Sequence, residues 1–265
     1  MKVGVIGGTG FYNLLDQVNE MTVDTEYGEI LVYQGEHAGK EVYFIPRHGA
    51  SHDSLAHQVN YKGIITAMTK LGVEKVLGMC AVGSLTLDIP VGGFALLNQF
   101  VDVTTKRDNT FGKYSCDMST PYCPDLRNDF IQSAENLNIY LYHNATYICV
   151  DGPRYETSAE IKLYASWGMH VVGMTNATEA ALAREAGLCY SVVTMASDIA
   201  AGITDTPPDL AMHKKVINEN KDKMANLILN AISNVTEDST CGCKAAYERA
   251  IKAREDKLKK AGVAN

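Results

Sequence analysis

Short apolar runs alternate along the chain with segments of helical spacing. Lys2–Ile6, Val73–Cys80 and Cys189–Ala196 are short and mainly apolar, as expected for strands that a sheet buries on both faces. Asn60–Leu71 instead repeats its apolar residues every three or four positions and ends before Gly72, which predicts an amphipathic helix. This alternation of strands and helices predicts an α/β fold.

The same pattern gives the other expected elements. Further strands are predicted at Thr22–Thr25, Ile30–Tyr33, Val42–Ile45, Phe94–Val103, Ala145–Val150 and Val171–Met174. Further helices are predicted at Leu126–Leu137, Ala159–Trp167, Glu179–Ala186, Leu210–Ile232 and Lys244–Lys260. Residues 104–124 are expected to form an irregular surface loop. No linker or repeat divides the chain, so we expect one domain over residues 1–265, with a mostly parallel or mixed central sheet flanked by helices and a charged C-terminal helix at about 244–260.

Charge and hydropathy narrow the classes of partner. The 265 residues are 46% hydrophobic and 21% charged, which is ordinary for a soluble globular protein, and the formal net charge is −7. A negative chain is a poor match for nucleic acid or an anionic membrane, so neither is expected as a partner. No apolar run reaches the roughly 18–20 residues that span a bilayer, and Met1 leads directly into a strand. We therefore expect a cytoplasmic protein.

Seven cysteines, an odd number, are spread along the chain. Most lie in apolar surroundings, so most are expected to be buried thiols. The pair in Cys241-Gly242-Cys243 is the exception, because its two thiols lie close together. Two interpretations of this pair are open: the two cysteines form a local disulfide, or they belong to an ordinary C-terminal segment.

The first strand runs into a glycine turn, Gly7-Gly8-Thr9-Gly10, where backbone N–H groups can point at an anion. Three interpretations are open: a dinucleotide site, a site for inorganic or sugar phosphate, and a purely structural turn. The dinucleotide fingerprint is incomplete, since Asn13 stands where its third glycine would be. No Walker-type Gly-Lys-Ser/Thr follows either.

Arg47 and His48 follow another predicted strand, between Pro46 and Gly49. Arginine can bind an oxyanion with two parallel hydrogen bonds, and histidine can donate a hydrogen bond or exchange a proton. His48, His52 and His57 lack the spacing and the further ligands of a metal site, so no metal is expected.

Carboxylates follow two later strands. Glu156, next to Tyr155, and Asp198 lie in predicted loops that otherwise hold small or aromatic residues. An aromatic face beside a hydrogen-bond acceptor suits a flat base that carries an N–H donor. The alternative is that both carboxylates are simply solvated.

Taken together, these segments resemble the methylthioadenosine phosphorylase branch of the trimeric purine nucleoside phosphorylases. The matching segments keep the family's order from residue 3 to about 205: Gly-Val-Ile-Gly-Gly-Thr-Gly (4–10), Pro-Arg-His-Gly (46–49), Gln-Val-Asn-Tyr (58–61), Ala-Val-Gly-Ser (81–84), Gly-Pro-Arg-Tyr-Glu-Thr (152–157), Gly-Met-Thr (173–175), Glu-Ala-Ala-Leu-Ala-Arg-Glu (179–185) and Ser-Asp-Ile-Ala-Ala-Gly (197–202).

The resemblance implies an enzyme that uses inorganic phosphate as co-substrate, without a cofactor, to cleave the bond between purine and ribose. It implies a homotrimer with sites near the subunit interfaces. It assigns phosphate binding to Thr9, Arg47, His48, Ala81 and Thr175, ribose binding to Met174, and base binding to Tyr155, Glu156, Asp198 and Ala200. Asp198 is also the expected catalytic residue, assisting N7 of the departing base.

Base selection is where the chain departs from the adenine-specific pattern. Glu156 and the Ala-Ala-Gly at 200–202 match the 6-oxopurine enzymes, whereas Asp198 stands where those enzymes usually carry Asn. An ionised Glu156 accepts from the N1–H of hypoxanthine or guanine, so we favour 6-oxopurine nucleosides such as inosine and guanosine. A 5'-methylthioadenosine or 5'-methylthioinosine phosphorylase is the alternative. A dinucleotide-dependent (NAD) oxidoreductase is a more remote one.

Overall fold

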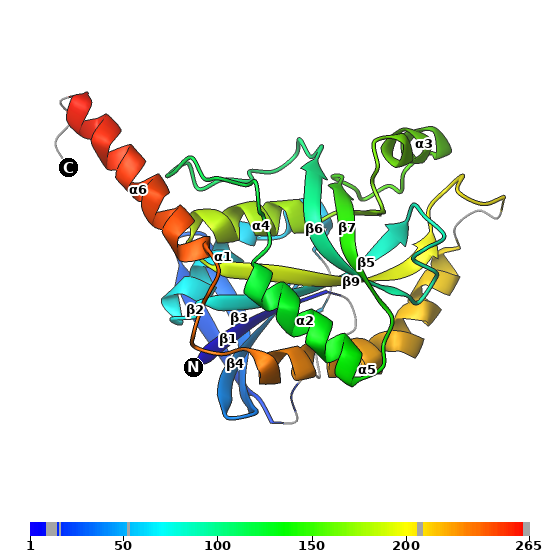
Figure 1. The fold of residues 1–265 in the computed structure, drawn as a ribbon, viewed down its shortest axis with the longest axis horizontal. Coiled ribbons are helices and arrows are strands. Elements are labelled where there is room, and N and C mark those ends of the chain that lie inside the picture. Colours follow the sequence, from blue (N-terminus) through cyan, green and yellow to red (C-terminus); the bar gives the residue numbers. More distant parts are fainter. Residues whose placement is uncertain (9–14, 16, 52–53, 206–208, 262–265) are drawn as a thin grey trace.

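The computed structural model describes residues 1–8, 15, 17–51, 54–205 and 209–261. Within them, nine strands form one mixed sheet in the order β2-β3-β4-β1-β5-β8-β7-β6-β9 (Figure 1). The strands are β1 (Lys2–Gly7), β2 (Asn19–Thr25), β3 (Gly28–His37), β4 (Lys40–Pro46), β5 (Lys75–Ser84), β6 (Phe94–Asp102), β7 (Leu141–Cys149), β8 (Val171–Gly173) and β9 (Cys189–Ile199). The single-domain α/β class with a mixed central sheet, expected from the sequence, is confirmed.

The sheet closes on itself at one end. Strand β1 lies parallel to both β4 and β5, and β2, β3 and β4 form an antiparallel meander at the other end. Strand β5 pairs with β8 near its carboxyl end and with β9 along its whole length, and β9 also pairs with β6. Since β6, β7 and β8 follow one another, these five strands form a ring.

Helices cover both faces of the sheet. They are α1 (Tyr61–Lys70), α2 (Pro124–Asn136), α3 (Ser158–Ser166), α4 (Asn176–Glu185), α5 (Leu210–Asn234) and α6 (Cys243–Lys260), with a short 3₁₀ helix, η1 (Ala56–Gln58). Successive residues of β1 point to opposite faces of the sheet and so reach different helix layers. Ile6 belongs to the core shared with α1 and α4, and Val5 belongs to the core shared with α2 and α5. A strand buried on both faces must be apolar where it is buried, as β1 is from Val3 to Gly7.

Two predicted strand ends are wrong, both next to the candidate site. The strand predicted at Val73–Cys80 ends too early, because the small residues Ala81–Ser84 continue β5. Asp198 was expected in a loop but lies on β9. The pairing of β5 with β9 shifts register between Val82 and Gly83, which leaves Ser197 as an extra residue. Small residues allow the two strands to continue in contact, and a bulge of this kind re-aims the side chains beside it.

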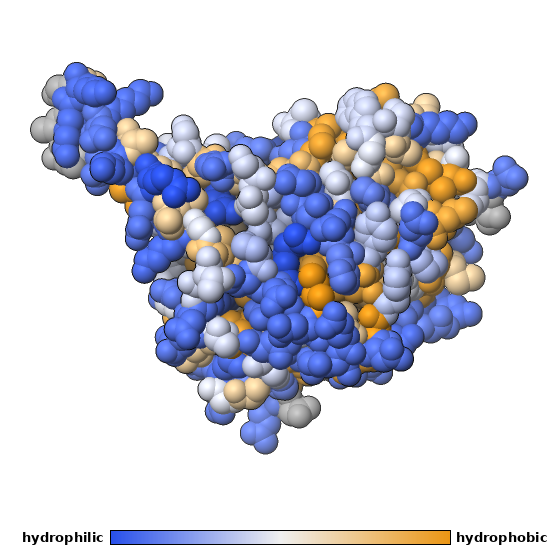
Figure 2. All heavy atoms as spheres, viewed as in Figure 1, coloured by the Kyte–Doolittle hydropathy of each residue, from blue (hydrophilic) through white to orange (hydrophobic). Residues whose placement is uncertain are grey.

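The last helix stands apart from the body of the molecule. In Figure 1, α6 projects away from the sheet, and Figure 2 shows that its visible surface is almost wholly hydrophilic. Only its Cys243 and Ala250 are buried. Among the described residues no helix is both long enough and apolar enough to cross a membrane.

Candidate active site

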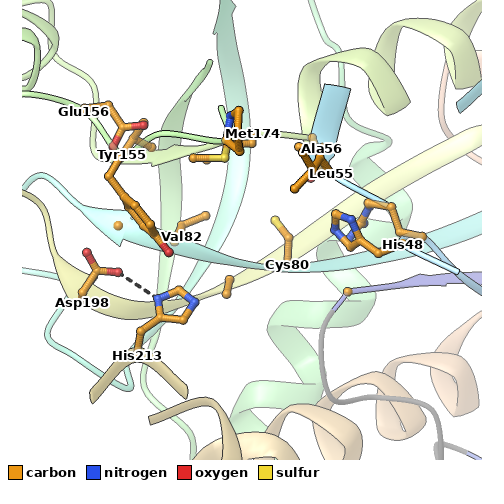
Figure 3. Close-up of a pocket in the computed structure, with 18 of the residues that line it drawn as sticks. His48, Leu55, Ala56, Cys80, Val82, Tyr155, Glu156, Met174, Asp198 and His213 are labelled. Atoms are coloured by element: carbon orange, nitrogen blue, oxygen red, sulfur yellow. Dashed lines mark hydrogen bonds and ion pairs between the residues drawn. The ribbon is translucent and has the colours of Figure 1, made fainter. Parts of the chain in front are cut away.

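A cavity of about 350 Å³ opens where several strands end. Gly8 follows β1, Arg47 follows β4, Met174 follows β8 and Asp198 lies near the end of β9, so the carboxyl ends of four strands meet there. Ligand sites of α/β proteins lie at this edge of the sheet. Figure 3 shows His48 on one side of the cavity and Tyr155, Glu156, Asp198 and His213 on the other, with Met174, Val82 and Cys80 between them.

Most of the residues assigned from the sequence surround this one cavity. They are Arg47, His48, Ala81, Tyr155, Glu156, Met174, Thr175 and Asp198. Thr9 lies outside the described residues, although the preceding Gly8 lines the cavity. Ala200 does not line it. Its N–H donates to Ser84 O at 2.8 Å, and its methyl group is buried in a small apolar cluster with Ile148 and Val172.

Arg47 is buried and held by Glu179 from helix α4. Its Nε donates to one Glu179 oxygen and its Nη2 to the other, at 3.0 Å for the second contact, while its Nη1 donates to Met79 O at 3.0 Å. The sequence had suggested that Arg47 binds an oxyanion through two parallel bonds, but in the structure Glu179 takes that position. The Nη1 atom remains beside Gly8, where a Cβ would meet it at 3.1 Å. Arg47 therefore presents one edge to the cavity.

The ion pair changes the proton affinity of Arg47. Burial alone disfavours its charge, but the adjacent Glu179 carboxylate outweighs burial and raises the pKa of Arg47 above its usual value. The network continues through Tyr190, whose hydroxyl donates to Glu179 at 2.6 Å and accepts from Asn176 Nδ2 at 2.7 Å. Asn176 is the first residue of α4, so the network fixes the start of that helix against the sheet.

The start of α4 faces the cavity. Thr175 is its N-cap residue, is only 6% exposed, and does not use its hydroxyl to cap the helix. Helix N-termini favour anions because the peptide dipoles align and the first N–H groups lack helical partners. His48 also lines the cavity, and its Nδ1 lies 2.9 Å from Ser54 O, which orients its ring. This end of the cavity offers hydrogen-bond donors with little net charge, since Glu179 balances Arg47.

Carboxyl groups lie at the opposite end (Figure 3). Asp198 Oδ1 accepts a hydrogen bond from Ser197 Oγ at 2.9 Å and lies 3.4 Å from Nδ1 of His213 on α5. The bulge in β9 leaves Ser197 unpaired and places Asp198 opposite Gly83 of β5. A Cβ at Gly83 would lie 3.1 Å from Val172 Cγ1, so glycine allows this close approach of β5 and β8.

Glu156 and Tyr155 complete that end. Burial, together with the charge of Asp198, raises the pKa of Glu156 above its usual value. The Tyr155 ring is 44% exposed and meets the His213 ring edge-on, with centroids 6.4 Å apart. The result is an aromatic surface next to two carboxyl groups, the combination that suits a flat base with N–H donors.

Met174 separates the two ends. A Cβ at Gly152, which has φ +65° and precedes Pro153 through a cis peptide bond, would lie 2.4 Å from Met174 Sδ. Arg107, from the loop after β6, donates to Met174 O at 2.6 Å and to Ala56 O at 3.0 Å. Glycine on one side and arginine on the other thus hold the methionine in the cavity wall.

Sequence reasoning missed Glu179, Arg107 and His213. Glu179 begins an alanine-rich helical stretch, and a carboxylate on an apolar helix face requires a buried cation, which could have indicated Arg47 as its partner. Arg107 and His213 carry no comparable signal. They come from a loop and from a long helix, and only the fold brings them to the cavity.

The described residues bring metal-ligating side chains together at another place. Cys123, Cys189, Cys241 and Cys243 have sulfur atoms that all lie within 4.8 Å of one another. No bond joins Cys241 to Cys243, and all seven cysteines are free thiols. None of the four lines the cavity.

Comparison with known proteins gives a consistent picture. The family model described as the phosphorylase superfamily matches residues 2–233. A probable 6-oxopurine nucleoside phosphorylase of Dictyoglomus turgidum is 41% identical, over 94% of this chain and 97% of the relative. The S-methyl-5'-thioadenosine phosphorylase of Pyrococcus furiosus is 38% identical, over 91% of this chain and 96% of the relative.

A solved structure is also similar. The adenosine/methylthioadenosine phosphorylase of Schistosoma mansoni, a double mutant in complex with adenine, superposes with a TM-score of 0.89 at 28% identity, covering 95% of this chain and 98% of that one. Relatives named for oxopurines and relatives named for methylthioadenosine thus have nearly equal identity. Overall similarity does not distinguish the two base preferences, so the side chains of the cavity must.

Proposed function

The chain belongs to the phosphorylase superfamily, as an enzyme of the pentosyltransferase type, and we propose that it cleaves 6-oxopurine nucleosides with inorganic phosphate. The reaction is reversible and releases the free purine and ribose 1-phosphate, or its 5-substituted form. One observation carries the proposal. A single cavity has hydrogen-bond donors at one end and the carboxyl groups of Glu156 and Asp198 at the other, with Met174 between them (Figure 3).

Phosphate binds at the donor end in this proposal. The start of α4 with Thr175, the edge of Arg47 that lines the cavity, His48 and the backbone near Gly8 surround the anion, with Ala81 beside it. Ribose lies against Met174, so that phosphate attacks C1′ from the face opposite the base. The bond to the purine breaks as the sugar gains oxocarbenium character. Fixing the anion within reach of C1′ supplies much of the acceleration, because it replaces a bimolecular encounter.

The purine binds at the carboxyl end, stacked near Tyr155. An ionised Glu156 accepts the N1–H of a 6-oxopurine, and Asp198 assists the departing base at N7 or donates to O6 when it is protonated. That arrangement matches the donor and acceptor edges of hypoxanthine and guanine.

One observation favours adenine nucleosides as a second candidate. Asp198 lies 3.4 Å from His213 Nδ1 and accepts a hydrogen bond from Ser197. An ionised Asp198 prefers the 6-amino group of adenine to O6. A 5'-methylthioadenosine or 5'-methylthioinosine phosphorylase is therefore the alternative to be distinguished by experiment.

The test compares inosine, guanosine, adenosine, methylthioadenosine and methylthioinosine as substrates, each with and without phosphate. We expect release of base only with phosphate and fastest from inosine or guanosine. Equally fast release of base without phosphate would indicate a hydrolase. No release from any of the five nucleosides would refute the proposal that the protein is a nucleoside-cleaving enzyme. Stabilisation by NAD(H), instead of by phosphate with a purine, would favour the oxidoreductase.

Replacing Glu156 by Ser tests the base assignment. The variant should lose inosine activity and gain activity on adenine nucleosides, because the serine hydroxyl no longer repels the N1 lone pair. An unpaired buried polar group costs about 1–3 kcal/mol, roughly 5- to 150-fold in kcat/KM. An unchanged preference would remove Glu156 from this role.

We further propose that the protein is a cytoplasmic homotrimer. Two residues at the mouth of the cavity, Leu55 and Tyr155, are 43% and 44% exposed in the isolated chain. A neighbouring subunit that covers this mouth would exclude water from the base and raise the strength of its hydrogen bonds.

A further inference from the structure

The four-cysteine cluster joins three parts of the chain that are distant in sequence. Cys123 is the N-cap residue of α2, Cys189 is the first residue of β9, and Cys241 and Cys243 flank Gly242 at the start of α6. Cys123, Cys189 and Cys243 are buried, and all four sulfur atoms lie within 4.8 Å of one another. The Cys189 and Cys241 sulfurs are 3.5 Å apart.

These spacings fit one tetrahedral ion. With zinc–sulfur bonds of about 2.3 Å, the edges of a tetrathiolate site are about 3.8 Å long. The observed limit of 4.8 Å therefore requires only small movements of the side chains. A tetrahedral set of four thiolates is characteristic of structural zinc and leaves no open position for a substrate.

We propose that Cys123, Cys189, Cys241 and Cys243 bind one structural Zn²⁺ ion. Zn²⁺ replaces four thiol protons, which are released to solvent, and leaves a site with two negative charges. Helices α2 and α6 both begin at the cluster, so the positive ends of their dipoles favour this charge.

The polypeptide around the cluster is already held in place. The Cys123 N–H donates to Tyr190 O at 2.8 Å, and the Cys189 N–H donates to Glu74 O at 2.9 Å. Asp125, in the first turn of α2, accepts from Cys241 N at 3.0 Å and from Thr240 N at 2.8 Å. Such outer contacts orient ligands and raise metal affinity, so Asp125 is a positioning residue for the site.

The position of the cluster indicates a structural role. Strand β9 runs from Cys189 at the cluster to Asp198 at the cavity, and nine residues of strand span about 30 Å. Zinc at one end of β9 would not touch substrate at the other. It would instead fix the base of α6, which has few other buried residues and projects from the body (Figure 1).

The experiment measures metal in the full-length chain purified under reducing conditions and supplied with Zn²⁺ alone. We expect about one zinc per chain by mass spectrometry of the metal, and four sulfur neighbours at about 2.3 Å by X-ray absorption. Co²⁺ in place of zinc should give the absorption of a tetrahedral thiolate complex. These measurements use the unmodified chain, so they hold even if a variant fails to fold.

Variants then identify the ligands. Cys189→Ser and Cys243→Ser should lose the zinc, and Asp125→Ala should weaken binding about 10- to 100-fold in competition with a chelator. Cys116→Ser is the matched control, since Cys116 lies outside the cluster and the cavity. This variant should keep one full equivalent of zinc. Removing zinc should lower the melting temperature and leave the kcat of nucleoside cleavage unchanged.

Other outcomes overturn the proposal. Fully reduced protein that binds no zinc, disulfides among the four cysteines in protein prepared without oxygen, or iron in place of zinc would each refute it. Retention of zinc by both cysteine variants would do the same. These results are independent of which nucleoside is cleaved, because none of them is read from enzyme activity.

Discussion

At the scale of single residues, the chemistry of the cavity depends on carboxyl groups in different surroundings. Glu179 is fully buried and paired with Arg47, whereas Glu156 lies partly buried beside Asp198, whose charge raises its proton affinity. Glu160, close to Glu156 in sequence, is bound instead by Arg154 at the surface. The same type of side chain therefore stabilises a buried cation, lines the cavity, or holds a surface contact, according to its neighbours.

Glu156 predicts an acid limit to activity. Only its ionised form accepts the N1–H of inosine, and both burial and Asp198 raise its pKa above the usual 4.5. As pH falls through that raised pKa, the carboxylate is protonated, so kcat/KM for inosine should fall at a higher pH than an ordinary glutamate would cause. The measurement is kcat/KM against pH for the wild type and for Glu156→Gln. The fall at low pH, the acid limb of the profile, should be absent from the variant.

Glu160→Gln provides the control for that profile. Hydrogen bonding by Arg154 lowers the pKa of Glu160 to about 2, so this group stays ionised across the assay range and its removal should leave the limb in place. An acid limb that persists in Glu156→Gln would show that another group causes it.

Glu179 predicts a large loss of stability. Replacement by Gln leaves Arg47 buried without its counter-charge, which costs about 3–5 kcal/mol in the free energy of unfolding. Urea unfolding measures the loss of stability in this variant and in Glu160→Gln, and the difference between them gives the effect of burying the ion pair. The exposed pair of Glu160 with Arg154 should be worth less than about 1 kcal/mol. Equal losses in the two variants would contradict the buried ion pair.

At the scale of elements, strand ends and turns place the side chains. The bulge in β9 places Asp198 opposite Gly83, and the N-cap position of α4 places Thr175 in the cavity wall. Gly152 holds the chain close against Met174 in a conformation that favours glycine. Each position is a local backbone feature, and each is required for the cavity as a whole.

The substitution Gly152→Ala should weaken catalysis in addition to straining the backbone. The new methyl group would lie 2.4 Å from Met174 Sδ, so the methionine must move and ribose binding should weaken. Gly168→Ala is the matched control, because Gly168 also has a positive φ, +82°, but has nothing within 4 Å of a Cβ. Both variants should lose about 1–2 kcal/mol of stability. Only Gly152→Ala should raise the KM for nucleoside, and equal KM values would refute the contact.

At the scale of the whole molecule, a closed ring of strands gathers the ends of β5, β8 and β9 at one cavity. The surface shows scattered apolar patches on the viewed face of the body and almost none on α6 (Figure 2). Exposed apolar side chains include Leu87 at 68% and Trp167 at 51%. Such residues are available for contacts with other subunits.

The proposed trimer predicts a particle of about three times the 28.9 kDa chain mass in sedimentation velocity. If neighbouring subunits cover the cavities, specific activity should fall when dilution separates the subunits, because water then enters the base site. A monomer of full activity at all concentrations would refute the trimer and its role in covering the cavity.

The sequence by itself was sufficient for the α/β class, for most elements, and for the segments that mark the family. These properties depend on local periodicity and on short motifs, both of which are visible along the chain. The confirmed elements differ mainly at their ends, since Ala81–Ser84 and Asp198 continue strands whose small or polar residues resemble turns. Strand length there depends on pairing between β5 and β9, which local pattern does not contain.

Tertiary structure alone decided how the site is assembled. The ion pair of Arg47 with Glu179 joins residues 132 positions apart, and His213 reaches Asp198 only because α5 crosses the end of β9. The four-cysteine cluster likewise joins positions 123, 189, 241 and 243, which lie in different elements. Contacts of this kind depend on the path of the chain through space. Periodicity reports only which face of an element is buried, and therefore says nothing of the partner across it.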